Sequence, residues 1–212
     1  SYSAVSKRIT MKIVFHKGFS MLELVITIGI FALISVFFLT FQSDVFSLNS
    51  LVTNTFSSQQ ESQQLLVAFI NEVRPASNSG TGAYPIAEAT SNAFTFYTDI
   101  QNVGVKQRIR YFLENGAIKK STLIPTGSPP TYNEENENTT TVMYGIQNGS
   151  NPLFKYYDNT YNGSSPPLEE PFNIPDIRFV KITAIRPLES SKSTTPRTYT
   201  TQVMLRNLKD NF

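Results

Sequence analysis

An uninterrupted apolar segment near the N-terminus constrains this chain more than any other feature does. Residues 24–41 include no charged side chain, and the longer stretch 19–41 is almost entirely apolar. A helix needs about 20 such residues to cross the roughly 30 Å of hydrocarbon in a bilayer. Four basic residues and no acid precede Gly18, and Asp44 is the first charge after the run. We therefore expect a single-pass membrane helix with a cytoplasmic N-terminus and an exported remainder after Gln42.

A cleaved secretory signal and a buried core helix are the alternatives to such a span. The run ends in LTFQSDVFSLNS, which offers no convincing small-residue site for signal peptidase. The run is too long and too uniformly apolar for a buried core helix of a soluble domain. Length and composition therefore favour a membrane helix, either as a plain signal anchor or with a further role.

Glu23 is an acid just inside the start of this apolar run. An ionised side chain costs up to about 3 kcal/mol at the centre of a membrane helix, and less near its end. Solvation of Glu23 by lipid headgroups is the simplest explanation. The other explanation is functional, because acids in membrane helices usually have a partner, and no base within the segment can provide one.

The residues around Glu23 form a compound pattern, KG|FSMLELVITIGI, which resembles the N-terminus of type IV pilins and of type II secretion pseudopilins. The resemblance implies that a prepilin peptidase recognises a basic leader that includes Lys17 and cuts after Gly18. Phe19 would then become the N-methylated first residue. Glu23 would pair with the terminal amine of a neighbouring subunit, an interaction that is stronger in a low-dielectric filament core than in water. A misaligned subunit would leave two buried charges unpaired, so the pair would also set register.

The expected organisation follows from these features. Residues 1–18 form the leader, for which Met11 is a plausible start because MKIVFHKG is a compact basic leader, although longer leaders exist. Residues 19–42 form the span and filament core, residues 43–74 its amphipathic continuation, and residues 75–212 an exported β-rich head. No proline occurs from Phe19 to Arg74, so we expect one continuous helix of about 80 Å. Its apolar stripe comprises Val45, Leu48, Val52, Phe56, Leu65, Leu66, Phe69, Ile70 and Val73.

The head is expected to consist of antiparallel strands. Asn115-Gly116 separates two strand-like runs and predicts a hairpin. Residues 126–141 are polar and of low complexity, which predicts a loop. Further strand-like runs are residues 92–99, 151–158, 176–187 and 197–208. The predicted fold class is therefore α+β, with the long helix packed on one antiparallel sheet in the pilin-like plan. The strand order also resembles that of J-type pseudopilins and W-type minor pilins.

We expect no catalytic activity and no cofactor. The chain has no cysteine, and its one histidine, His16, lies in the leader, so nucleophile–histidine pairs and His or Cys metal sites would be missing after cleavage. Asp158 and Asn162 are a weak candidate pair of calcium ligands, because one carboxylate is a poor start and Asn162-Gly163 is typical of a turn.

The expected function is a structural minor pilin or pseudopilin of a type II secretion pseudopilus or type IV pilus in the bacterial inner membrane. The resemblance implies as partners the prepilin peptidase, other pilin subunits, an inner-membrane assembly platform, the lipid bilayer and secreted cargo. A DNA-uptake pilus component and a signal-anchored extracytoplasmic binding domain stay open as alternatives. Without residues 1–18 the chain would have 14 basic and 16 acidic residues, which argues against nucleic acid as a partner.

Overall fold

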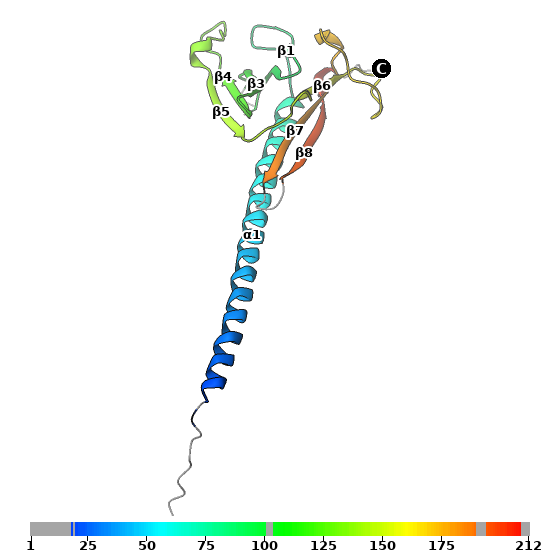
Figure 1. Cartoon of the computed structure of the whole chain (residues 1–212). Coiled ribbons are helices and arrows are strands. Elements are labelled where there is room, and N and C mark those ends of the chain that lie inside the picture. The colour runs from blue at the N-terminus through cyan, green and yellow to red at the C-terminus, as the bar shows by residue number, and fades with distance from the viewer. Residues whose placement is uncertain (1–17, 19, 101–103, 190–193, 209–212) are drawn as a thin grey trace, which may run out of the picture. The chain divides into compact units, whose positions relative to one another are not determined.

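The chain folds into one long helix and two antiparallel sheets, an α+β architecture (Figure 1). The computed structural model describes residues 18, 20–100, 104–189 and 194–208. The chain divides into two units, residues 1–48 and 49–212. Helix α1 (Met21–Val73) begins in the first unit and ends in the second. The expected continuous helix is thereby confirmed, and it ends two residues before Pro75, which cannot continue a helix.

The larger sheet has five strands in sequence order. These are β1 (Ile86–Ala89), β2 (Ala93–Thr98), β3 (Gln107–Glu114), β4 (Ala117–Leu123) and β5 (Asn138–Met143). Asn115 and Gly116 join β3 to β4 with φ angles of 50° and 68°, the left-handed backbone that a two-residue hairpin turn requires. The predicted hairpin is therefore confirmed.

The smaller sheet comprises β6 (Phe154–Tyr157), β7 (Phe179–Glu189) and β8 (Thr194–Met204), in that order. The predicted antiparallel strands are therefore confirmed, but they form two sheets and not the single sheet that was expected. Turn residues lie between β5 and β6, where Gly145 and Gly149 have φ angles of 71° and 58°. The buried side chain of Asn148 accepts a hydrogen bond from the Ile185 amide and donates one to the Thr183 carbonyl, both at 2.8 Å. The segment between β5 and β6 is therefore hydrogen-bonded to β7, and β6 then pairs with β7 in a second sheet.

The segment 126–141 also differs from its prediction as a loop. Thr126 and Thr131 form an isolated β-bridge, a 3₁₀ turn follows at Glu134–Asn136, and β5 begins at Asn138. The β-branched threonines of β5 favour an extended strand, which polarity alone does not reveal. Strand β1 was not predicted either. Two further 3₁₀ turns occupy Ile174–Asp176 and Arg206–Leu208.

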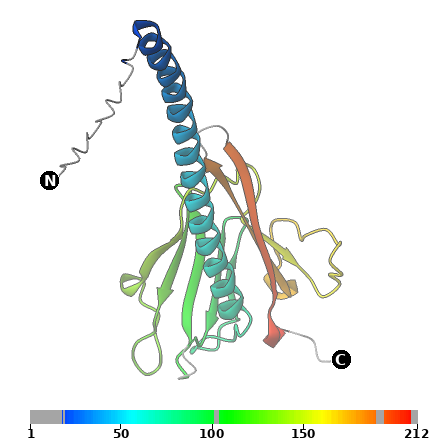
Figure 2. The same cartoon turned by 90° about the horizontal axis from the view of Figure 1, so that it is seen from below.

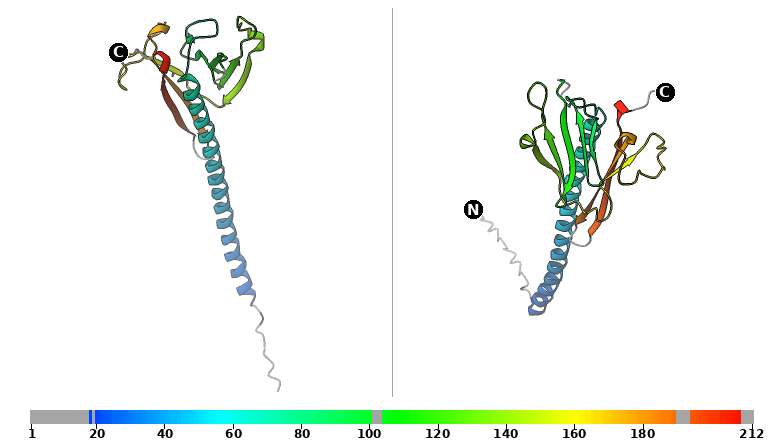
Figure 3. Two further views of the ribbon diagram at one scale, coloured as in Figure 1. Left: turned by 180° about the vertical axis from the view of Figure 1, so that it is seen from behind. Right: turned by 90° about the horizontal axis from the view of Figure 1, so that it is seen from above.

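The hydrophobic core of the second unit lies between the two sheets and the end of α1. Figures 2 and 3 show the five-stranded sheet along one side of this part of the helix and β7 and β8 along the other. The Phe69 ring is fully buried, and its centroid lies 5.3 Å from that of Tyr111 on β3 and 5.9 Å from that of Phe154 on β6. Phe69 therefore joins the helix to both sheets.

Only the last part of the predicted apolar stripe is buried. Leu65, Phe69 and Val73 have at most 3% of their surface exposed, whereas Val52 and Phe56, in the same unit, are 41% and 68% exposed. The helix therefore packs on the head through its final three to four turns, and the expectation that Val52 and Phe56 pack there is wrong.

Candidate processing and assembly segment

The start of α1 carries a helix cap that includes Glu23. The hydroxyl oxygen of Ser20 accepts a hydrogen bond from the Glu23 amide at 3.2 Å, and the Ser20 carbonyl accepts one from the Leu24 amide at 3.1 Å. Ser20 is thus the N-cap, and Glu23 is the third helical residue. Ser-x-x-Glu is the sequence signature of a capping box. This local signal was present in the sequence and was missed there, since Glu23 was interpreted only through its place in an apolar run.

Glu23 is exposed in the first helical turn. A carboxylate at this position interacts favourably with the partial positive charge of the helix N-terminus. From Leu24 to Gln42 the helix then contains no further charged side chain. Glu23 thus lies between the helix cap and the apolar segment, and its exposed carboxylate is accessible to a partner outside its own helix.

Gly18 is the only residue of the predicted cleavage site that the structure describes. It is exposed, a β-carbon there would meet nothing within 4 Å, and its φ is not in the left-handed region. No feature of the described fold therefore requires glycine at position 18. Lys17 and Phe19, the other two predicted processing residues, lie outside the described residues.

Residues Met21–Asn49 form one helical segment that is long and apolar enough to span a membrane. Its large apolar side chains are exposed in the unit itself, for example Phe31 at 73% and Phe37 at 81%. A surface of this size needs an apolar environment, as a bilayer or other apolar helices would provide.

The hydroxyl groups inside this segment bond to the helix itself. Thr27 donates to the Leu24 carbonyl at 2.9 Å, and Ser35 donates to the Phe31 carbonyl at 2.8 Å. Thr40 likewise donates to a carbonyl in the preceding turn. Such bonds supply partners for polar atoms where no water is present. The segment is therefore chemically compatible with a hydrocarbon environment in spite of these residues.

Two acids on the second half of α1 connect the helix to the head, and sequence reasoning missed both. Glu72 is buried, accepts a hydrogen bond from the Tyr111 hydroxyl at 2.8 Å, and pairs with the Lys120 ammonium. Glu61 pairs with the Arg186 guanidinium of β7 at 2.7 Å. These partners lie far away in the sequence, so no local pattern identifies them. Glu72 attaches α1 to the five-stranded sheet, and Glu61 attaches it to the three-stranded sheet.

The weak calcium candidate is a pair of Asx turns. The Asp158 carboxylate accepts hydrogen bonds from the amide and hydroxyl of Thr160 at 2.9 and 2.7 Å, and these bonds lower the pKa of Asp158. The Asn162 side-chain oxygen accepts from the amides of Ser164 and Ser165. The described residues include no group of three or more His, Cys, Asp or Glu side chains placed to hold a metal ion. The two oxygens thus already serve the loop backbone.

A scan against protein-family models and a search of curated proteins each give no match to this chain. The described residues form an α+β protein with one N-terminal helix that is long and apolar enough to span a membrane.

Proposed function

We propose that this chain is a structural subunit of a cell-envelope filament, of the minor pilin or pseudopilin type. J-type pseudopilins of type II secretion and W-type minor pilins of type IV pili would be its functional analogues. The observation that carries the proposal is Glu23, an exposed carboxylate in the first turn of α1, directly before the uncharged and largely exposed helical segment 24–42. The described fold does not require glycine at position 18, because a β-carbon there would meet nothing within 4 Å. This supports a role for Gly18 in processing.

In the proposed mechanism a prepilin peptidase cuts after Gly18 and frees the amine of Phe19. The apolar segment of α1 holds the mature subunit in the inner membrane until the assembly platform extracts it. Glu23 then pairs with the Phe19 amine of a neighbouring subunit, and the apolar helices form the filament core. A pair of this kind gains most when water is excluded, and it penalises subunits in the wrong register.

N-terminal mass spectrometry of the protein isolated from its host tests the processing step. The expected mature chain begins at N-methylated Phe19. Gly18→Val should leave an unprocessed chain, while Gly29→Val, a matched change within the apolar helix, should be processed normally. An intact leader on the wild-type protein would overturn the proposal.

A second candidate is a signal-anchored extracytoplasmic domain that forms no filament. The cap at Ser20 favours it, because a glutamate three residues after the cap residue has a local role without any neighbour. Glu23→Gln separates the two candidates, since glutamine also suits a capping box but carries no charge. The filament proposal expects normal membrane insertion and loss of incorporation into filaments. Normal incorporation of the glutamine variant would favour the plain anchor.

A DNA-uptake pilus component is the remaining alternative within the same machinery. It would require a basic stripe on the head to neutralise phosphates. The part of the chain after Gly18 has more acidic than basic residues, which weighs against this alternative.

A further inference from the structure

The outer face of the five-stranded sheet carries a polar row that crosses all five strands. Cross-strand partners along it are Glu88, Thr95, Arg110, Ser121 and Thr139. On β3 the odd-numbered Ile109 and Tyr111 are buried toward α1, so the even-numbered side chains point to the opposite face. The row is therefore on the side of the sheet that the helix does not cover.

A groove of about 330 Å³ opens along this row and is lined mainly by charged side chains. Its lining consists of Ala87, Glu88, Thr95, Arg108, Arg110, Glu134 and Glu137. The volume is at the lower end of the range for small-molecule sites. The groove has two guanidinium groups and three carboxylates, so it has one more negative charge than positive at neutral pH.

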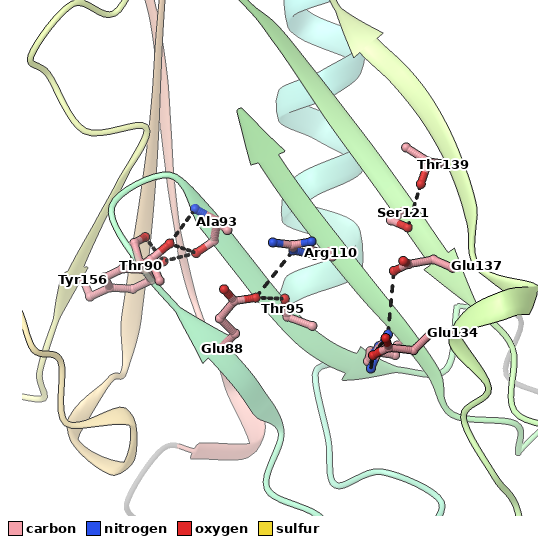
Figure 4. A network of polar contacts seen from close by, with 11 residues as sticks. Glu88, Thr90, Ala93, Thr95, Arg110, Ser121, Glu134, Glu137, Thr139 and Tyr156 are labelled. Carbon is pink, nitrogen blue, oxygen red and sulfur yellow. Dashed lines mark hydrogen bonds and ion pairs between the residues drawn. The ribbon is translucent and has the colours of Figure 1, made fainter. Parts of the chain in front are cut away.

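The two arginines differ in how well they are paired (Figure 4). Both terminal nitrogens of Arg108 lie 3.4 Å from Glu134 Oε1, and one lies 3.8 Å from Glu137 Oε1. The guanidinium carbon of Arg110 lies over the Phe112 ring, 4.8 Å from the ring centroid. Its Nε forms an ion pair with Glu88 Oε2 at 3.5 Å, a distance longer than an ordinary hydrogen bond, and has no hydrogen-bond partner among the described residues.

Within the described part of the chain, the terminal nitrogens of Arg110 have no hydrogen-bond acceptor. The guanidinium is planar and presents its donors in a fixed fork, which matches the two oxygens of a carboxylate. Arg110 lines the groove together with Glu88, Glu134 and Glu137, and Figure 4 shows its ion pair with Glu88. A carboxylate on Arg110 would thus lie among acids, which favours a ligand that carries a positive charge as well.

The wall of the groove that contains Glu134 and Glu137 is fixed in place. The Tyr132 hydroxyl donates to the Lys106 carbonyl at 2.7 Å and accepts from the Gly80 amide at 3.2 Å. The Asn133 side chain caps the short turn by accepting from the Glu135 amide at 3.1 Å. The site therefore needs little ordering when a ligand binds, which is a property of preorganised sites.

We propose that this groove binds the zwitterionic head group of an α-amino acid, with its carboxylate on Arg110 and its ammonium facing Glu137. This inference is independent of the proposed filament function, since it concerns only the head. The same chemistry could come from a free amino acid or from a diamino acid in a cell-wall peptide.

The test uses the full chain in detergent micelles and saturation-transfer NMR observed on the ligand. The probes are L-alanine, which has both charges, propionate, which has only the carboxylate, and ethylamine, which has only the ammonium. We expect saturable binding of alanine and binding about tenfold weaker or more for each single-charge probe. Absence of an alanine signal, or equal binding of alanine and propionate, would overturn the proposal.

Substitutions locate the site. Arg110→Gln should weaken alanine binding about tenfold, and Arg110→Lys, which keeps the charge but not the fork, should be intermediate. Arg197→Gln, at an exposed position of β8 outside the groove, is the matched control and should bind as the wild type does. Unchanged binding in both Arg110 variants, at an unchanged thermal midpoint, would refute the assignment.

Glu137→Gln tests the second half of the site. It should reduce the preference for alanine over propionate, a ratio that a purely structural residue would not change. Competition then identifies the source: displacement of alanine by a soluble muropeptide with an unlinked diamino acid supports a cell-wall ligand. Displacement by the free diamino acid alone supports a solute.

Discussion

Glu72 of α1 accepts a hydrogen bond from the Tyr111 hydroxyl of β3 at 2.8 Å, in the interior of the head. The same carboxylate pairs with Lys120 of β4, whose ammonium also lies 5.9 Å from the centre of the Tyr111 ring. Burial and the neighbouring carboxylate raise the pKa of Tyr111, so its hydroxyl remains a donor. One acid thus fixes how the helix is rotated on the five-stranded sheet.

Glu72→Leu is expected to lower the free energy of unfolding by about 3 kcal/mol, because Lys120, whose side chain is only 19% exposed, then loses its carboxylate partner. Urea unfolding of the full chain in detergent, followed by near-ultraviolet circular dichroism, measures this. Glu61→Gln is the control, since the Glu61 side chain is 46% exposed and its pair with Arg186 should contribute at most about 1 kcal/mol. Equal losses in the two variants would contradict the central place of Glu72.

Phe69→Ala is expected to cost about 3–5 kcal/mol, the range for removing a buried phenylalanine that leaves a cavity. The ring is fully buried and contacts aromatic residues of both sheets. Val67 lies on the same helix and is 56% exposed, so Val67→Ala should change the free energy of unfolding by less than about 0.5 kcal/mol. Similar thermal midpoints for the two variants would show that the helix is not anchored through Phe69.

The parts of the fold that local sequence determines were predictable. The helix follows from a long stretch without proline, and the β3–β4 hairpin follows from Asn115-Gly116. The separation into two sheets was not predictable, because it depends on which distant strands pair. In the same way β5 was predicted as a loop, since its segment is polar and of low complexity and its pairing with β4 only becomes known in the fold.

The candidate site shows the same division. The place of Glu23 at a helix start is a local property, and Ser20 makes it readable as a capping box. The role of Glu72 depends on Tyr111 and Lys120, 39 and 48 positions away, so the sequence around it looks like an ordinary solvated helix surface. The charged groove is nonlocal as well, because three strands and a turn supply its side chains.

Gly116→Ala is expected to cost about 1 kcal/mol or more in thermal or urea unfolding. The residue has a φ of 68°, where a β-carbon is strained, and the new atom would lie 3.4 Å from the Ile146 carbonyl oxygen. Asn115→Gly, one position earlier in the same turn, should change the stability by less than about 0.5 kcal/mol. A neutral Gly116→Ala substitution would contradict the left-handed turn.

Millimolar calcium is expected to leave the thermal midpoint of the protein unchanged. The Asp158 and Asn162 oxygens already accept hydrogen bonds from their own loop, and a lone carboxylate provides little of the charge that calcium needs. A rise in midpoint that disappears in Asp158→Ala would contradict this and would identify a calcium site in the loop.

Alkaline pH is expected to destabilise the head through its buried tyrosines. Burial raises the pKa of Tyr156 well above its ordinary value of 10, and its hydroxyl donates to the Thr90 carbonyl at 2.8 Å. The unfolded chain therefore loses this proton first, so the stabilisation is complete below pH 10 and decreases as the pH rises above it. Tyr156→Phe should cost about 1 kcal/mol at pH 8, where the lost hydrogen bond dominates, and should decline less steeply above pH 10. Tyr144→Phe, at a 63% exposed side chain, should follow the wild-type curve, and parallel curves for all three proteins would contradict the role of Tyr156.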